Sequence, residues 1–304
     1  MKRILIFEYI TGGGLIENKL DHHLLTEANM ILRSLIDTTK YQISFFCDYR
    51  HKYANRKEAI IVNQNNSQII YDAEFINQYD YFIPVCPEND FISYNYTKKL
   101  SPNIENLYSS DLRTILITTD KIRLKKICTE NNILNPDTYD SDVKNTLFIT
   151  KDRFGCGCSD TYFVEKGKYE DLNNITEKYI PGNSHSVNLH VSENNYRVLS
   201  INKHKMTVSK GRIQVKSILV NLYPTNKNLI FKFIDDVISI LPNLRGFVGI
   251  DFIEYKGEFF LIEVNPRYTT SMSMLQKCKN TSCLDYIEDT ICDIAGKTCQ
   301  LNLI

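Results

Sequence analysis

The sequence predicts an α/β protein with α+β subdomains, in which an open, mainly parallel sheet is followed by antiparallel strands. Strand-like and helix-like segments alternate through the first third of the chain, which is typical of a parallel sheet covered by helices. Strand-like segments at hairpin spacing then follow one another. The length of 304 residues allows two or three units, and 43% hydrophobic with 24% charged residues indicates a folded globular protein.

The first unit begins with an apolar, β-branched segment over Lys2–Tyr9, which predicts a buried strand. Thr11–Gly14 is a glycine turn, and apolar residues at helical spacing follow over Leu20–Ile36. Phe91–Lys99 predicts another helix. The further strands expected in this unit are Tyr41–Cys47, Glu58–Val62, Gln68–Tyr71 and Asp80–Val85.

The second part of the chain opens at Asp120, a favourable N-cap for a helix over Lys121–Asn131. Lys227–Leu241 is amphipathic and predicts a helix, and Cys283–Ile294 predicts the last one. The strands expected here are Leu147–Lys151, Thr161–Val164, Ile175–Ile180, Ser184–His190, Tyr196–Ile201, Gln214–Asn221, Phe247–Tyr255 and Phe259–Val264.

Composition excludes several function classes. Lys+Arg and Asp+Glu both number 36, so the chain lacks the overall surplus of cations that duplex binding needs. No window approaches the roughly 18 apolar residues of a membrane span, and the short apolar run before Glu8 does not fit a signal peptide. We therefore expect a cytoplasmic protein that binds neither nucleic acid nor membrane. The nine cysteines are expected to be free thiols, as is usual in cytosolic proteins, and Cys156 and Cys158 are spaced too closely for a zinc knuckle.

The clearest chemical signal comes from two predicted strands near the C-terminus. Glu263 and Asn265 alternate along one strand and therefore share a face, and Asp251 on the preceding strand can lie opposite them. Carboxylate and amide oxygens are ligands that Mg²⁺ prefers, and Mn²⁺ is the alternative cation. Apolar flanking residues indicate buried strands, in which two carboxylates without a cation would repel each other. The other interpretation is a solvated polar strand face.

Asp251 followed by Glu263-x-Asn265-Pro266-Arg267 resembles the metal-binding end of ATP-grasp ligases. The resemblance continues upstream, in the order of the family's motifs, over about half of the chain. Asp120-Lys121 is similar to the start of the family's small central domain, Ile149–Lys151 to the segment of its second lysine, Arg153–Ser159 to its flexible glycine loop and Glu177–Gly182 to its adenine-binding hinge.

The resemblance implies an ATP-grasp fold with ATP and Mg²⁺ as cofactors. Its expected domains are residues 1–105 as an N-terminal α/β (pre-ATP-grasp) domain, 106–182 as a central lid and 183–304 as a C-terminal antiparallel-sheet domain with the metal site. Asp251, Glu263 and Asn265 are then the implied metal ligands. The implied nucleotide-binding residues are Lys121, Lys151, Gly155, Gly157, Ser159, Glu177, Lys178, Tyr179 and Ile180, the implied catalytic residues Lys151 and Arg267, and the implied substrate contacts Glu8, Gly13, Arg267 and Ser271.

The implied activity joins a small-molecule carboxylate to an amine. The carboxylate attacks the γ-phosphate of ATP to give an acyl phosphate and ADP, and the amine then displaces phosphate. Phe7–Gly14 and Glu263–Ser271 are most similar to a subgroup that joins the γ-carboxylate of L-glutamate to tyramine in methanofuran biosynthesis. Besides Arg267, the sequence leaves open which cation holds the acceptor carboxylate among Lys203, Lys205, Lys210 and Lys216.

Two alternatives remain at this point. One is an ATP-grasp ligase for other amino acids or peptides, and the other is a non-catalytic nucleotide-binding protein on the same fold. In relatives an acidic residue after the hinge holds the ribose, but Asn183–His185 contains no carboxylate, so this contact is not assigned. Whether the protein forms a homodimer is also left open.

Overall fold

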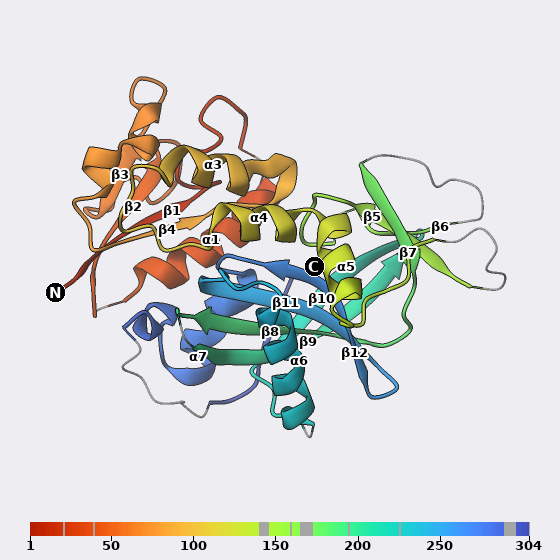
Figure 1. Ribbon diagram of the computed structural model, residues 1–304. Helices are drawn as coiled ribbons and strands as arrows, with labels where there is room; N and C mark the ends of the chain where they lie inside the picture. The colour runs from red at the N-terminus through yellow and green to blue at the C-terminus, as the bar shows by residue number, and fades with distance from the viewer. Residues whose placement is uncertain are drawn as a thin grey trace.

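The structure consists of two sheets connected by helices (Figure 1). We describe it from a computed structural model, which covers residues 1–20, 22–38, 40–139, 146–158, 160–164, 173–193, 195–224, 226–288 and 296–303. One sheet lies in the N-terminal part of the chain, and the other contains the remaining strands. This is the predicted arrangement of an open parallel sheet followed by antiparallel strands.

The N-terminal sheet has four strands that all run parallel. Its elements, with the helices that follow, are β1 (Arg3–Glu8), α1 (His22–Ile36), β2 (Gln42–Asp48), β3 (Ala59–Val62), η1 (Ser67–Tyr71), α2 (Ala73–Ile76), β4 (Tyr81–Val85), η2 (Asn89–Phe91), α3 (Ile92–Leu100), α4 (Leu112–Thr119) and α5 (Lys121–Glu130). The strand order is β3-β2-β1-β4, and five of the six residues of β1 are buried. Such burial is expected for a parallel strand covered on both faces.

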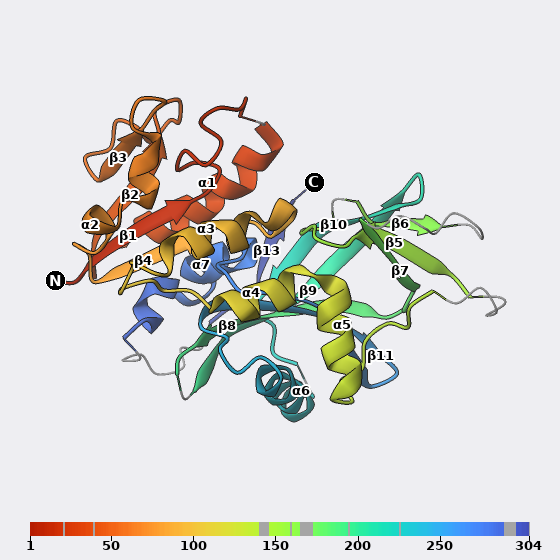
Figure 2. The ribbon, with the colours of Figure 1, turned by 45° about the horizontal axis from the view of Figure 1, so that its top comes forward.

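The second sheet is antiparallel, and in Figure 2 it extends from below the N-terminal sheet to the right edge of the molecule. Its elements are β5 (Phe148–Asp152), β6 (Tyr162–Val164), β7 (Asn174–Lys178), β8 (Asn183–Val191), β9 (Tyr196–Ser209), β10 (Arg212–Val220), α6 (Lys227–Ser239), β11 (Gly246–Tyr255), β12 (Glu258–Asn265), η3 (Thr270–Met274), α7 (Leu275–Lys279), η4 (Cys283–Tyr286) and β13 (Cys299–Asn302). The order is β12-β11-β8-β9-β10-β6-β5-β7, with β13 paired to β10. β12 is therefore an edge strand.

An apolar core joins the two sheets into one body. Ile4 and Phe45 of the parallel sheet share a buried cluster with Leu199, Phe247 and Tyr268 of the C-terminal part. Helix α1 packs on η3, which follows the last long strand. A second cluster fills the space between the antiparallel sheet and α6. The strands that carry the predicted metal ligands are thus held from both sides.

Several segments differ from the expectations. Gln68–Tyr71 is part of the 3-10 helix η1 and not a strand, because a short apolar run is compatible with either form. Of the helix expected over Cys283–Ile294, the described residues 283–288 contain the short 3-10 helix η4, and the rest lies outside the described part. The sequence pattern does not predict α4, which is rich in β-branched residues of low helix propensity, or the four-residue strand β13.

The expected domain boundaries stay predictions. Asn106 and Tyr108 still pair through their backbones with Phe82, so the chain follows the first sheet beyond residue 105. Within the described ranges, none of the helices combines the length and apolar character that crossing a bilayer requires. The eight cysteines that the structure describes are free.

The start of α5 depends on Asp120, the predicted N-cap. Its carboxylate, which is 2% exposed, accepts hydrogen bonds from the backbone N–H groups of Ile122 and Arg123. The guanidinium of Arg153 donates to both of its oxygens, at 2.7 and 2.6 Å. One side chain therefore holds both the helix and the strand end that enters the glycine loop.

We predict that Asp120→Ala lowers the free energy of unfolding by about 3 kcal/mol, because it removes a helix cap and one partner of a buried ion pair. Urea titration would measure the change. Asp111→Ala is the matched control, because Asp111 caps α4 through a single backbone N–H and is exposed, so that its loss should cost about 1 kcal/mol. Equal losses in the two variants would contradict a special role for Asp120.

Candidate active site

The three predicted metal ligands lie together at the edge of the antiparallel sheet. The register of β11 and β12 places Asp251 directly opposite Glu263 and Gly249 opposite Asn265. The side-chain N–H₂ group of Asn265 donates to Oδ2 of Asp251 and to Oε1 of Glu263, both at 3.2 Å. One amide thus connects two neighbouring carboxylates.

The two carboxylates are largely withdrawn from water and influence each other's ionisation. Burial, and then the charge of Glu263, raises the pKa of Asp251 well above its usual range. Burial also acts to raise the pKa of Glu263, but the cation of Lys121 at 3.7 Å and further partners outweigh it, so that this pKa is lowered. The pair therefore favours one charged and one protonated carboxyl group when no cation lies between them.

This donor set fits a magnesium ion. Mg²⁺ is commonly held by one or two carboxylates together with water and substrate phosphates. Within the described part of the chain, no three His, Cys, Asp or Glu side chains gather as a complete metal site. A cation here would take its remaining ligands from the Asn265 oxygen, from water and from substrate. The metal role of the three residues stays a prediction.

The first predicted lysine connects the carboxylate pair to the glycine loop. The ammonium of Lys121 lies 3.7 Å from Oε2 of Glu263 and donates to the carbonyl of Gly155. The backbone N–H of Lys121 donates to the carbonyl of Arg153 at 3.2 Å. The lysine is 8% exposed, so its charge is held among protein acceptors.

The glycine loop needs its glycines for two different reasons. Gly157 has φ = +75°, a conformation that other residues adopt with difficulty. Gly155 packs so closely on Asp152 that a Cβ atom would lie 2.8 Å from its Oδ2. Ser159, the third residue predicted to contact nucleotide here, lies outside the described residues.

The loop is docked on the N-terminal domain. The ring of Phe154 lies 4.6 Å from the ring of Phe91, measured between centroids. The thiol of Cys156 donates to Oδ1 of Asn89 at 2.9 Å. Asn89 and Phe91 both belong to η2, so the glycine loop contacts the segment that follows β4 of the first sheet.

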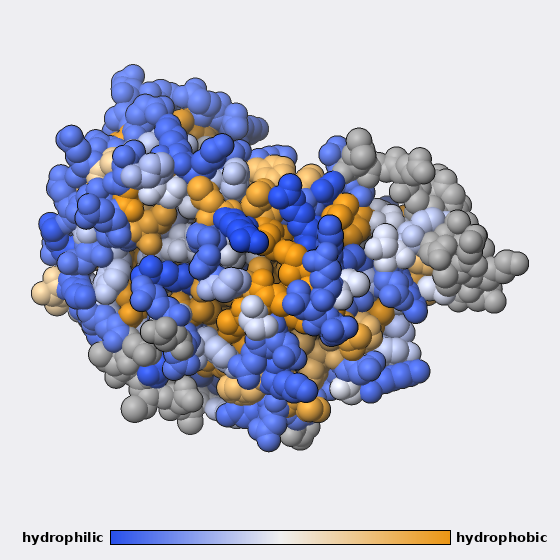
Figure 3. Space-filling model, in the orientation of Figure 1, coloured by the Kyte–Doolittle hydropathy of each residue, from blue (hydrophilic) through white to orange (hydrophobic). Residues whose placement is uncertain are grey.

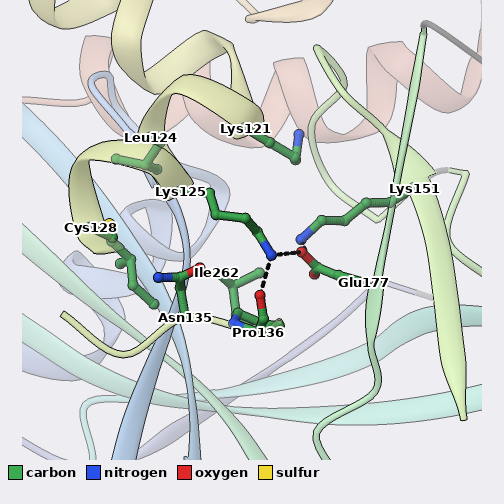
Figure 4. A pocket seen from close by; sticks show the side chains of 10 residues that line it. Lys121, Leu124, Lys125, Cys128, Asn135, Pro136, Lys151, Glu177 and Ile262 are labelled. Atoms are coloured by element: carbon green, nitrogen blue, oxygen red, sulfur yellow. Dashed lines mark hydrogen bonds and ion pairs between the residues drawn. The ribbon is translucent and has the colours of Figure 1, made fainter. Parts of the chain in front are cut away.

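The second predicted lysine lies in a buried charge cluster (Figure 4). The ammonium of Lys151 lies 2.5 Å from Oε1 of Glu177, which is 2% exposed. Lys125 approaches the other oxygen of Glu177 at 3.3 Å and also donates to the carbonyl of Pro136. Burial lowers the pKa of Lys125, although Glu177 acts in the opposite direction. One carboxylate is thus shared by two ammonium groups.

These side chains border a small pocket between α5, β7 and β12. Its free space for water-sized molecules is about 10 Å³, roughly that of one water. Lys125 also lines a wider outer groove of 750 Å³, in which Ile122 and Leu134 are exposed. Apolar residues gather around this region in the surface view (Figure 3). Lys125 therefore forms part of the wall between the pocket and the groove.

The predicted hinge follows β7 directly. The backbone N–H of Lys178 donates to the carbonyl of Asp137 at 2.8 Å, and that of Tyr179 to the carbonyl of Leu147 at 2.9 Å. These two donors are therefore satisfied within the protein. The carbonyl of Ile180 also accepts from the N–H of Gly182 at 2.9 Å, which narrows the expected adenine contacts of the hinge to the carbonyl of Lys178 and the N–H of Ile180.

Arg267 is held by a partner that sequence patterns do not reveal. Its Nε donates to both oxygens of Glu88, at 2.9 and 3.0 Å, and Nη2 donates to Oε2 at 2.8 Å. Nη1 donates to the carbonyl of Tyr268 at 3.3 Å. The Glu88 carboxylate raises the pKa of this guanidinium against the opposing effect of burial. The contact joins the N-terminal domain to the end of β12.

Two predicted substrate contacts in the N-terminal domain have structural partners. Burial raises the pKa of Glu8, although its carboxylate accepts hydrogen bonds from the N–H and hydroxyl of Thr11 and from the N–H of Ile10. Gly13 has φ = +96°, and a Cβ atom there would lie 2.6 Å from Val62. Both residues therefore shape the turn after β1, and their contact with substrate stays a prediction.

The predicted contact at Ser271 and the candidate lysines are less accessible to the site. Ser271 is 5% exposed and exchanges hydrogen bonds with Asn188. On β9, Lys203 and Lys205 alternate with Asn202 and His204, so these two lysines lie on the sheet face opposite Asp251. Lys210 on the β9–β10 turn and Lys216 on β10 are exposed.

Three residues near the site are not found by sequence reasoning: Glu88, Lys125 and His204. Nε2 of His204 lies 3.0 Å from the hydroxyl of Ser186, and Nδ1 lies 3.2 Å from that of Ser184. Burial lowers the pKa of His204 to about 4, so its imidazole is neutral near pH 7. For His204, the available sequence signal is its alternation with Asn202 along β9, a strand that β8 separates from β11.

A family model of the ATP-grasp domain matches residues 118–271, half of the chain, and this range contains the carboxylate pair, both predicted lysines and the hinge. The chain belongs to the ATP-grasp family. The match makes it an enzyme of the ATP-grasp family.

Among individual proteins, the chain is similar to tyramine–L-glutamate ligases. It is 27% identical to the enzyme of Methanocaldococcus fervens, over 88% of each chain, and 26% identical to that of Methanocaldococcus jannaschii, over 88% of this chain and 83% of the relative. The fold resembles the crystal structure of an ATP-grasp superfamily protein from Archaeoglobus fulgidus, with a TM-score of 0.79, 22% identity and coverage of 99% and 92%.

We predict opposite stability effects for the two carboxylates in the ligand-free protein. An acid whose pKa is raised on folding destabilises the folded state at pH values above its unfolded pKa. Asp251→Asn should therefore raise the free energy of unfolding at pH 8 by about 1 kcal/mol. Glu263→Gln should not stabilise the protein, because the pKa of Glu263 is lowered. Both variants should lose the stabilisation by Mg-ATP.

Chemical unfolding with and without Mg-ATP would measure these effects. Stabilisation by nucleotide that equals that of the wild type in both variants would contradict the metal assignment. A less stable Asp251→Asn protein would show that the two carboxylates do not repel each other.

Proposed function

We propose that this protein joins the γ-carboxylate of L-glutamate to tyramine or a related amine, in the biosynthesis of a methanofuran-type coenzyme. The supporting observation is its similarity to the two tyramine–L-glutamate ligases, which extends over 88% of this chain and includes both the N-terminal sheet and the ATP-grasp part. The proposed reaction uses ATP and releases ADP and phosphate. The acceptor site then lies between the two parts of the chain, where Arg267 meets Glu88.

The charges of the site suit a phosphoryl transfer to a carboxylate. Asp251, Glu263 and Asn265 would hold Mg²⁺, which supplies positive charge next to the phosphates. Lys121 lies beside Glu263, and the positive charge of Arg267 acts to lower the pKa of Asp251. By their position and charge, such cations stabilise the phosphoryl group in the transition state of its transfer, without forming a covalent bond to it.

In this proposal the carboxylate oxygen of the acceptor attacks the γ-phosphorus, and the bond between that phosphorus and ADP breaks. The amine then attacks the acyl carbon, and phosphate leaves with the oxygen that came from the carboxylate. The glycine loop would shield the acyl phosphate from water, since Phe154 and Cys156 already hold the loop against η2.

We predict that ADP release requires both a carboxylate and an amine. Purified protein with Mg-ATP, L-glutamate and a panel of amines should release ADP fastest with tyramine or a close aryl-ethylamine. D-glutamate and L-aspartate are the matched controls, because they change only the handedness or the reach of the acceptor. Faster turnover with an unrelated amino acid pair would replace the proposed substrates. ADP release that no acceptor stimulates would contradict the ligase reaction.

We further predict that Lys151→Ala weakens nucleotide binding more than folding. Its partner Glu177 still has Lys125 at 3.3 Å, so the ligand-free protein should keep most of its stability. The gain in stability with Mg-ATP, which follows RT ln(1 + [L]/Kd), should shrink. Lys126→Ala is the control, because Lys126 is an exposed lysine of α5. A thermal shift with Mg-ATP as large as in the control would remove Lys151 from the nucleotide site.

A further inference from the structure

The contact between Glu88 and Arg267 is unusual for its burial and its reach. The Glu88 side chain is 4% exposed and that of Arg267 is 16% exposed. The two residues are 179 positions apart, one after β4 in the parallel sheet and the other after β12 in the antiparallel sheet. Removing one member of such a buried pair leaves the other charge without compensation.

The hydrogen bonds of Arg267 show which part of the guanidinium remains available. A guanidinium has five N–H donors in a rigid, planar arrangement. Among the described residues, Glu88 takes the Nε donor and one Nη2 donor, and the Tyr268 carbonyl takes one Nη1 donor. One N–H on each terminal nitrogen is then left for a ligand. Two such donors match the spacing of two oxygens of a phosphoryl or carboxylate group.

The groups that interact electrostatically with Arg267 belong to three parts of the site. The other groups that act electrostatically on the guanidinium include the Cys156 thiol of the glycine loop and the Glu263 carboxylate. Asp251 and Glu8 are in turn influenced by the charge of Arg267. The guanidinium is therefore within electrostatic reach of the turn after β1, of the glycine loop and of the carboxylate pair.

Glu88 precedes a segment with a strained backbone, and the glycine loop packs against this segment. Asp90 has φ = 52° and Phe91 has φ = 57°, and two consecutive non-glycine residues with positive φ are uncommon. Strain of this kind persists only where surrounding contacts impose it, and it is frequent at functional sites. Here the contacts are those of Asn89 with Cys156 and of Phe91 with Phe154.

We propose that Glu88 is a positioning residue for Arg267: it holds one edge of the guanidinium so that the two remaining N–H groups face the phosphoryl group during transfer. The proposal rests on the proposed ligase function. Without Glu88, the guanidinium would turn to the next carboxylate, Glu263, and would compete with the metal. Glu88 itself does not touch the reacting atoms in this account.

The test compares Glu88→Ala, Glu88→Gln and Arg267→Ala, the double variant Glu88→Ala/Arg267→Ala, and Ser34→Ala. Ser34 is the matched control, because its hydroxyl lies 2.9 Å from the hydroxyl of Tyr268 and so bridges the same two parts of the chain without touching the guanidinium. Steady-state ADP release with glutamate and amine gives kcat and the KM for ATP. Thermal shifts with Mg-AMP-PNP, and with Mg-ADP plus aluminium fluoride, report the ground state and the transferring state separately.

We expect Glu88→Ala to lower kcat on the order of 10²-fold, because a small displacement of a charged donor is enough for such a loss. The KM for ATP and the shift with AMP-PNP should stay close to wild type, while the shift with aluminium fluoride should largely disappear. Glu88→Gln should lose less, since its amide oxygen still accepts from Arg267. In the Arg267→Ala background, Glu88→Ala should add little, since it acts through that residue.

Full additivity of Glu88→Ala and Arg267→Ala would overturn the proposal, as would equal losses of both thermal shifts or a similar defect in Ser34→Ala. If Glu88→Ala does not fold, Glu88→Gln, which keeps the shape of the side chain, takes its place. The same comparison then applies: a smaller thermal shift with aluminium fluoride at an unchanged shift with AMP-PNP supports the proposal, and equal losses overturn it. A wild-type protein that neither AMP-PNP stabilises nor any acceptor activates would instead refute the proposed function, and the inference with it.

Discussion

Two carboxylates directly opposite each other across an antiparallel strand pair are the constraint on which the rest of the site depends. Asp251 and Glu263 cannot move apart, because β11 and β12 are fixed by the apolar cluster between the sheet and α6. Their charges are withdrawn from water, and the pKa of Asp251 is raised by burial and by its neighbour. Such a pair is unfavourable for folding alone and becomes favourable when a cation joins it.

The cations around the pair are each held by a protein acceptor. Lys121 contacts Glu263 and the carbonyl of Gly155, Lys151 pairs with Glu177, and Arg267 pairs with Glu88. The protein therefore orders these long side chains before a ligand arrives, which reduces the entropy that binding must offset. Each cation also joins different elements, so the geometry of the site depends on how the glycine loop and the two sheets meet.

Much of this site could be predicted from the sequence because it follows local periodicity. Glu263 and Asn265 alternate on one strand, and the hairpin brings Asp251 beside them. Glu88 and Lys125 could not be predicted, since their partners are set by tertiary packing, and Arg267 is 179 positions from Glu88. In the fold, the β-branched helix α4 and the short run at Gln68–Tyr71 were ambiguous for a related reason: packing decides their conformation, and local propensity does not.

The central claim, that a carboxylate substrate attacks the γ-phosphate of ATP, is tested most directly by following its oxygen atoms. L-glutamate labelled with ¹⁸O in the γ-carboxylate would be incubated with the protein, Mg-ATP and tyramine, and the released phosphate would be examined by mass spectrometry. This mechanism predicts one ¹⁸O atom in the released phosphate for every amide formed, because the carboxylate oxygen that attacks the γ-phosphorus leaves with it. Unlabelled phosphate, or label in AMP, would contradict it.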